Sequence, residues 1–186
     1  MLTTQNLNNF YINGYAILSF PEAFKYNFDN YIFERAGQQP DDYVYKNDPL
    51  INPIINEFAQ LIEERYVSFF GSDYTNLRKL SANGCHTKAR KWHDDRDTWA
   101  SLNISLVFNL YLDDTKEHNN GFDIKTATEE FNLFPKKGDL FMLNVSDSFK
   151  HKGNINNDTV NRRIMTFDYH IPALNKTTWH FTINII

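Results

Sequence analysis

Two features of the amino-acid sequence predict a mainly β protein with flanking helices towards its N-terminus. From about residue 77 the chain is a series of short segments rich in β-forming residues, separated by turns that contain Gly, Pro, Asn and Asp. Before this series, two segments carry apolar side chains at helical spacing, and each has one wide apolar stripe to bury. A β-sandwich with helices packed on one sheet accommodates these stripes better than an open α+β arrangement. We therefore predict a jelly roll, that is, a double-stranded β-helix.

The first predicted elements are a strand and a helix. The segment YAILSF, residues 15–20, is typical of a short strand. A helix is predicted to begin at Pro21 and to stop at Gly37, because proline suits the first turn of a helix and glycine its end. Its apolar face would consist of Phe24, Phe28, Tyr31 and Ile32. Residues 38–49 are predicted to form a loop.

A second and stronger helix is predicted after this loop. Asn52 is expected to be its N-cap, Pro53 occupies the first turn, and Gly71 lies just beyond its end. The apolar stripe of this helix consists of Ile54, Ile55, Phe58, Leu61, Ile62, Tyr66 and Phe69. Because the stripe is wide, we expect it to lie against the sheet.

The remainder of the chain is predicted to be strands. One segment, SLNISLVFNLYL (residues 101–112), is nearly all apolar and is typical of a strand buried on both faces. The other expected strands are GCHTKARKWH (84–93), FDIKTAT (122–128), EEFNLF (129–134), DLFMLNV (139–145), NRRIMTFDYH (161–170) and WHFTINII (179–186). Turns are expected at 113–121, 135–139 and 154–158.

Composition limits the class of protein. We predict one domain, residues 1–186, because this length can bury a full core and no linker or repeat divides it. The single Cys85 excludes an internal disulfide, and the first residues contain neither a basic region nor an apolar run of a signal peptide. No uncharged run is long enough to span a bilayer, and the net charge of −4 provides no general attraction to nucleic acid. We expect a cytoplasmic protein.

A cluster of histidine and acids, KWHDDRD at residues 91–97, is the first candidate site. If this segment is a strand running into a turn, His93 and Asp95 share one side and Asp94 points away. The distal His151 follows a turn, an apolar strand and a short polar bend. Two imidazoles and one carboxylate form the facial triad of non-haem Fe(II) oxygenases. Zinc hydrolases also use three protein ligands, so the ligand set alone leaves the metal open.

The motifs around these ligands follow one another in a definite order along the chain. They are His93-Asp94-Asp95, Tyr111-Leu112-Asp113 at a strand end, the Asn120-Gly121 turn, Pro135-x-x-Gly138-Asp139 before a strand, His151, and arginines on the last core strand. In this order they resemble the Fe(II)/2-oxoglutarate-dependent dioxygenase superfamily over roughly residues 80–170. The pattern is similar to its prolyl-hydroxylase-like members, and FYINGYAIL at 10–18 resembles phytanoyl-CoA-hydroxylase-like members. The halogenating members carry a small residue at the position of Asp95, so the resemblance favours hydroxylation.

This resemblance implies a set of ligands and a reaction. His93, Asp95 and His151 would bind Fe(II), and 2-oxoglutarate would chelate the metal, with O2 taking the last position. A buried arginine, Arg162, would pair with the far carboxylate of 2-oxoglutarate, because a planar guanidinium matches a carboxylate fork. Tyr111 would be a hydroxyl partner of that carboxylate, or else an ordinary core tyrosine. The reaction implied is hydroxylation of a substrate, with release of succinate and CO2.

Arg162 is preferred to its neighbour Arg163 because adjacent residues of a strand face opposite ways. With Arg162 inside the barrel, Ile164 and Thr166 share its face, so Thr166 joins the expected cosubstrate site. The opposite face would then carry Arg163, Met165, Phe167 and Tyr169. We expect those apolar residues to meet the helices and Arg163 to lie at the sheet margin with its head in water.

The residues near the two ligand segments bear on the class of substrate. Basic residues surround the two ligand segments: Lys88, Arg90, Lys91, Arg96, Lys150 and Lys152. They favour an anionic small molecule, or an exposed side chain or base, unless they merely solvate strand ends. Trp92 and Trp99 either line the pocket or pack as ordinary aromatic residues. Nucleic acid as substrate, and the oligomeric state, stay open; the rival functions are a non-catalytic jelly-roll binding module and a cupin-like metal-dependent hydrolase.

Overall fold

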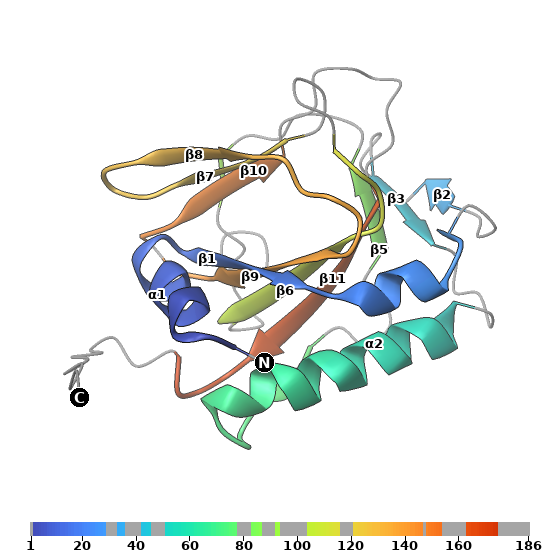
Figure 1. Cartoon of the computed structure of the whole chain (residues 1–186), viewed down its shortest axis with the longest axis horizontal. Helices are drawn as coiled ribbons and strands as arrows, with labels where there is room; N and C mark the ends of the chain where they lie inside the picture. Colours follow the sequence, from blue (N-terminus) through green and yellow to red (C-terminus); the bar gives the residue numbers. More distant parts are fainter. Residues whose placement is uncertain are drawn as a thin grey trace.

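Two antiparallel sheets and a layer of helices make up the protein (Figure 1). A computed structural model describes residues 2–28, 33–35, 42–45, 51–77, 83–86, 92–93, 104–115, 121–146, 148–153 and 163–174; at 33–35, 42–45 and 83–86 it describes the backbone alone. The expected strand WHFTINII lies outside the described residues.

The larger sheet has the strand order β1-β9-β6-β11-β5-β3-β2, and β4 pairs with β11. Its strands are β1 (Tyr15–Ser19), β2 (Phe33–Arg35), β3 (Asp42–Tyr45), β4 (Thr75–Asn76), β5 (Asn83–His86), β6 (Leu106–Tyr111), β9 (Asp139–Asn144) and β11 (Arg163–His170). The smaller sheet has the order β10-β7-β8. Its strands are β7 (Phe122–Lys125), β8 (Glu130–Leu133) and β10 (Lys150–Gly153). Sequence neighbours are thus distributed between two sheets, as a jelly roll requires.

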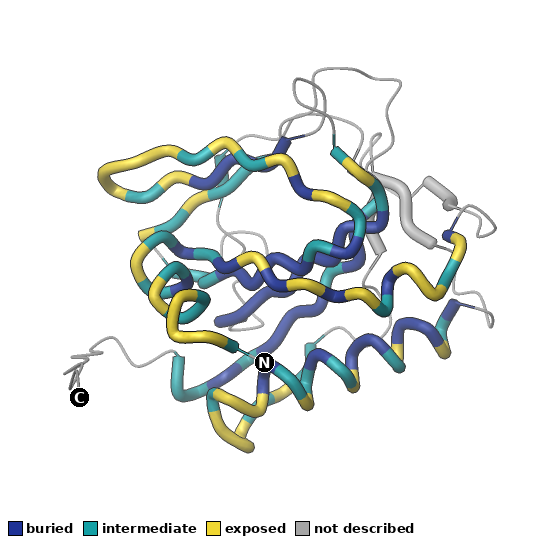
Figure 2. The backbone as a smooth tube through the Cα atoms, in the orientation of Figure 1, coloured by how far each residue is buried: buried dark blue, intermediate teal, exposed yellow. Residues whose placement is uncertain are grey.

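One apolar core lies between the larger sheet and the helices. The long helix α2 (Asn52–Arg65) buries Ile54, Ile55, Phe58 and Ile62 of the predicted stripe. Phe69, also assigned to that stripe, lies beyond the helix and is exposed. Met165, Phe167 and Tyr169 of β11 belong to the same core. Figure 2 shows the buried side of α2 turned towards the sheet and its exposed side turned towards solvent. The prediction that the helix stripe meets this face of β11 is confirmed.

A second core lies between the two sheets. Its buried members are Ile104, Val107, Tyr111, Phe122, Ile124, Phe141, Leu143 and Ile164, which come from strands of both sheets and from the residues before β6. All six residues of β6 are buried, which confirms that this strand is covered on both faces. At one edge of the barrel, the rings of Tyr15 on β1 and Phe131 on β8 lie 5.8 Å apart and connect the two sheets.

Several N-terminal elements differ from the prediction. The helix expected to span Pro21 to Gly37 is a short 3-10 helix, η1 (Pro21–Lys25), and the chain is already extended at Tyr26. Asn27, Asp29 and Asn30 follow, and such side chains compete with helical backbone hydrogen bonds. The expected helix and loop instead supply β2 and β3, which pair with each other and extend the sheet through β5.

The helix ends also needed correction. The N-cap of α2 is Ile51, one residue before the predicted Asn52, and it forms no side-chain cap hydrogen bond. After Arg65 the chain continues as a 3-10 helix, η3 (Val67–Phe70). A further helix, α1 (Thr4–Ile12), was not predicted. The sequence feature that marks the start of this helix is a capping box, in which the Thr3 and Asn6 side-chain oxygens each accept a hydrogen bond from the other residue's backbone N–H.

Candidate metal and cosubstrate site

His93 and His151 face each other across an antiparallel β-bridge. The His93 N–H donates to the His151 carbonyl at 3.1 Å, and the His151 N–H donates to the His93 carbonyl at 2.9 Å. Residues directly opposite in such a pair project their side chains to the same face. The two imidazole rings accordingly lie 4.5 Å apart, centroid to centroid, at an interplanar angle of 61°. The two histidines are therefore brought together from distant parts of the sequence.

The imidazoles point into the space between the two sheets. His151 lies opposite Ile124 in the pairing of β10 with β7. Ile124 and Phe122 belong to the core between the sheets. The Phe122 ring lies 5.3 Å from the His151 ring, which places this imidazole on the inner face. Two half-buried imidazoles side by side, bordered by an apolar core, form a donor set that fits a divalent transition metal.

The predicted third ligand, Asp95, lies outside the described residues, as does Asp94. Among the residues that are described, no group of three His, Cys, Asp or Glu side chains is placed to hold a metal ion. The structure thus describes two of the three expected ligands.

Two of the three expected cosubstrate residues, Tyr111 and Thr166, lie on the inner face of β6 and β11. Tyr111 lies opposite Ile164, and Asn109 lies opposite Thr166. The Thr166 hydroxyl donates to the Asn109 side-chain carbonyl at 2.9 Å. Tyr111 and Thr166 therefore lie on the same face of the sheet, in neighbouring cross-strand pairs of that face. Arg162 lies outside the described residues. Asn109 was not anticipated, although a lone asparagine inside the apolar strand LVFNLY was an available signal.

A series of aromatic contacts connects the histidines to Tyr111. The Phe122 ring lies 5.3 Å from that of His151 and 5.5 Å from that of Phe141. The Phe141 ring in turn lies 5.3 Å from that of Tyr111, which is fully buried. The interior between the histidines and the inner face of β6 is therefore largely apolar, and a polar ligand bound there would meet few competing waters.

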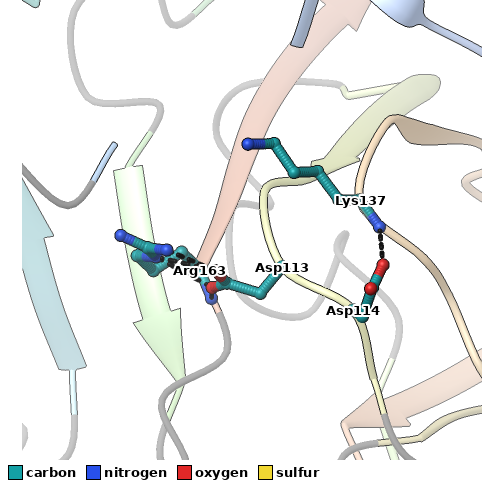
Figure 3. A network of polar contacts seen from close by, with 4 residues as sticks. All are labelled: Asp113, Asp114, Lys137 and Arg163. Atoms are coloured by element: carbon teal, nitrogen blue, oxygen red, sulfur yellow. Dashed lines mark hydrogen bonds and ion pairs between the residues drawn. The ribbon is translucent and has the colours of Figure 1, made fainter. Parts of the chain in front are cut away.

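Arg163 does not extend into water as predicted. It forms an ion pair with Asp113 at the end of β6 (Figure 3). The Arg163 backbone N–H donates to Asp113 Oδ2 at 3.0 Å, its Nε donates to Oδ2 at 2.8 Å and Oδ1 at 3.1 Å, and its Nη2 also donates to Oδ1. The side chains are only 17% (Arg163) and 24% (Asp113) exposed. Asp113 is the last residue of the Tyr111-Leu112-Asp113 motif, but the sequence alone did not predict a role for it.

The segment after β6 is also joined to the turn before β9. Asp114 Oδ1 accepts a hydrogen bond from the Lys137 backbone N–H at 2.9 Å (Figure 3). The Gly138 N–H donates to the Tyr111 carbonyl at 2.9 Å. Gly138 has φ +84°, and a Cβ there would lie 2.6 Å from Phe24, so this turn requires glycine. These bonds hold the C-terminal end of β6, where Tyr111 lies.

Lys150, Lys152 and Trp92 lie on the outer face of the smaller sheet. They alternate with His151 and His93, whose side chains point inwards. Lys152 pairs with Asp123 at 3.2 Å, and its ammonium group lies 4.6 Å from the centroid of the Trp92 ring. The charge of Lys152 is therefore already compensated, and Trp92 packs against lysine. The other basic residues near the ligand segments lie outside the described residues: Lys88, Arg90, Lys91 and Arg96.

No protein-family model matches the sequence, and no curated protein matches it. Solved structures, by contrast, align over nearly the whole chain. HygX from Streptomyces hygroscopicus, with nickel and 2-oxoglutarate bound, has a TM-score of 0.67 and 14% identity over 91% of this chain and 87% of that chain. A prolyl hydroxylase from Trichoplax adhaerens, in complex with a hypoxia inducible factor peptide fragment, has a TM-score of 0.65 and 11% identity over 94% of this chain and 91% of that chain. EctD from S. alaskensis, with bound Fe, has a TM-score of 0.63 and 12% identity over 93% of this chain and 78% of that chain.

The fold of this chain is therefore that of the Fe(II)/2-oxoglutarate-dependent oxygenases. This result confirms the predicted double-stranded β-helix, which is the fold of the superfamily that the motifs resemble. Of these structures, that of HygX contains nickel and 2-oxoglutarate, and that of EctD contains Fe. None of the described helices is long and apolar enough to cross a membrane.

Proposed function

We propose that the chain, as a single domain, is an Fe(II)- and 2-oxoglutarate-dependent dioxygenase that hydroxylates a small or anionic substrate and releases succinate and CO2. One observation carries the proposal: His93 and His151 are opposite residues of an antiparallel bridge, and their imidazoles converge on the inner face of a double-stranded β-helix. In the structures that share this fold, HygX binds nickel and 2-oxoglutarate and EctD binds Fe. A non-catalytic module would have no need of this convergence.

In this proposal His93, Asp95 and His151 hold the metal. Bound iron with 2-oxoglutarate and O2 would supply the oxidising chemistry. The protein contributes neutral imidazoles, one carboxylate and an interior with little water. The backbone hydrogen bonds of the His93–His151 bridge fix the separation of two of these ligands before metal binds, so binding needs less rearrangement.

The cosubstrate site is proposed to consist of Arg162, Tyr111 and Thr166. The facing of β11 supports this choice, because Ile164 lies in the inner core while Met165 and Phe167 lie under the helices. A residue one place before Arg163 in an extended strand would share the inner face with Ile164. The guanidinium of Arg162 would then bind the far carboxylate, with hydroxyl donors available from the other two residues.

Structures with this fold contain two kinds of bound substrate-sized molecule. HygX has been solved with hygromycin B and the prolyl hydroxylase with a peptide fragment, so this fold accommodates both small molecules and side chains. Because Lys152 is compensated by Asp123, any attraction for an anion would come from the other basic residues near the ligand segments. We propose a small molecule or an exposed side chain or base as substrate, in a reducing cytoplasm where Fe(II) is maintained.

The test begins without O2. Adding Fe(II) and 2-oxoglutarate to the protein should produce the weak visible charge-transfer band of a metal–2-oxoglutarate chelate. The band should be absent in His93→Ala and His151→Ala and retained in Asp94→Ala, whose side chain is proposed to point away from the metal. Admission of O2 should then yield succinate, slowly when no substrate is present. A zinc hydrolase would show no band, and a binding module would bind no 2-oxoglutarate; either result would refute the proposal.

A further inference from the structure

A cross-strand row of side chains lies on the outer face of the smaller sheet, directly behind the two histidines. Because His93 faces His151 in an antiparallel bridge, the residue before His93, Trp92, faces the residue after His151, Lys152. Lys152 in turn lies opposite Asp123 of β7. The row therefore runs from Trp92 through Lys152 to Asp123 and spans the segment and the two strands that carry or support the histidines.

Lys152 has a partner on each side within this row. Its ammonium group lies 4.6 Å from the centroid of the Trp92 ring and 3.2 Å from Asp123 Oδ2. Lys125, on β7, lies over the same ring at 5.8 Å. An ammonium group near an aromatic face and a carboxylate is attracted by both, so Lys152 bridges the tryptophan and the aspartate.

The Asp123 carboxylate depends on this lysine. Asp123 is 4% exposed, and within the described part of the chain its Oδ1 has no hydrogen-bond partner. A buried carboxylate is costly unless it is paired, so Lys152 is held firmly at this position. The lysine side chain is itself only 27% exposed, which limits the screening of both contacts by solvent.

We propose that Lys152 is a positioning residue that holds the segment Trp92–His93 (the His93 segment) against β10 and so keeps the two imidazoles together. The inference rests on the proposed function, because the histidines are taken as metal ligands. The described contacts between the His93 segment and β10 are two backbone hydrogen bonds, the ring contact of the histidines and the Trp92–Lys152 contact. Since Trp92 and His93 are adjacent, fixing the indole on the outer face also fixes the imidazole on the inner face.

The experiment separates the charge of Lys152 from its bulk. Lys152→Met keeps the length and apolar contact of the side chain and removes the cation, whereas Lys152→Arg keeps the cation. The matched control is Lys150→Met, which removes an exposed lysine from the same strand and the same outer face. Hydrogen exchange of the His93 and His151 amides is measured in the metal-free protein, where it reports the opening of the bridge.

Lys152→Met should accelerate exchange of both amides on the order of tenfold, the effect expected for loss of a partly buried cation–π contact. Lys152→Arg should restore exchange to near the wild-type rate, and Lys150→Met should leave it unchanged. In a second measurement, without 2-oxoglutarate, Lys152→Met should weaken Mn(II) binding by about fivefold relative to Lys150→Met. If Lys152→Met fails to fold because Asp123 is left uncompensated, the double variant Asp123→Asn/Lys152→Met should fold and show the same faster exchange.

Wild-type exchange rates and Mn(II) affinity in Lys152→Met, or in the double variant, would overturn the inference. The charge-transfer band of the wild-type protein would still establish the proposed function in that case. If the wild-type protein binds no metal, the proposed function fails, and with it the assignment of Lys152 as a positioning residue for metal ligands. A bridge opened in Lys152→Met but not rescued by arginine would also overturn it, because the cation would then not be the cause.

Discussion

Replacing Asp113 with alanine should destabilise the protein more than replacing the adjacent Asp114 does. The carboxylate accepts hydrogen bonds from the backbone N–H, Nε and Nη2 of Arg163, and the two side chains are 24% and 17% exposed, respectively. A hydrogen bond to a charged group contributes about 1.5–3 kcal/mol to stability, whereas an exposed ion pair contributes about 0–1 kcal/mol. For this partly exposed cluster we expect a loss of about 2–3 kcal/mol, or about 5–10 °C in melting temperature.

Urea denaturation provides the assay. The midpoint for Asp113→Ala should fall while the slope stays unchanged, since the surface exposed on unfolding is the same. Asp114→Ala is the matched control: this adjacent, exposed residue accepts one described hydrogen bond, from the Lys137 N–H, so its loss should cost no more than about 1 kcal/mol. In a double-mutant cycle, Asp113→Ala and Arg163→Met should show a coupling energy of at least about 1 kcal/mol. Additive effects, or equal losses in the two aspartate variants, would refute the reasoning.

Three further predictions concern the metal, the cosubstrate and pH. Alanine substitution of any one proposed ligand, His93, Asp95 or His151, should sharply lower the iron content after anaerobic reconstitution. Unchanged iron content in all three variants would contradict the assignment. Arg162→Ala should raise the apparent constant for 2-oxoglutarate at least tenfold with iron retained, whereas Arg163→Ala should mainly lower stability; the reverse would place the strand register one residue off. The hydrogen bond from Arg65 lowers the pKa of Glu22, so its stabilisation is present above the ordinary glutamate pKa of about 4.3 and is lost as the pH falls through the lower folded value. Glu22→Gln should therefore be less stable than wild type at pH 7, and a difference that persists in strong acid would contradict this.

The sequence by itself determined the features that depend on local periodicity and apolar content. The doubly buried β6 followed from an almost uninterrupted apolar run, and the stripe of α2 followed from helical spacing. The alternation along β11 correctly predicted that Met165 and Phe167 meet the helices while Ile164 lies between the sheets. The two apolar helical stripes followed by a series of β-rich segments predicted the jelly roll, the fold that the solved structures confirm.

Only the tertiary structure decided the pairings between distant segments. The segment expected to be the C-terminal part of a helix is β2, because β3 and β5 provide it with a sheet to extend. Arg163 was expected in water, but Asp113, 50 residues earlier in the chain, lies within reach of its guanidinium. The partners of Lys152 likewise come from β7 and from the residue before His93. Local propensity cannot specify such contacts, because strand pairing and register are set by the burial of whole faces rather than by the residues of one segment.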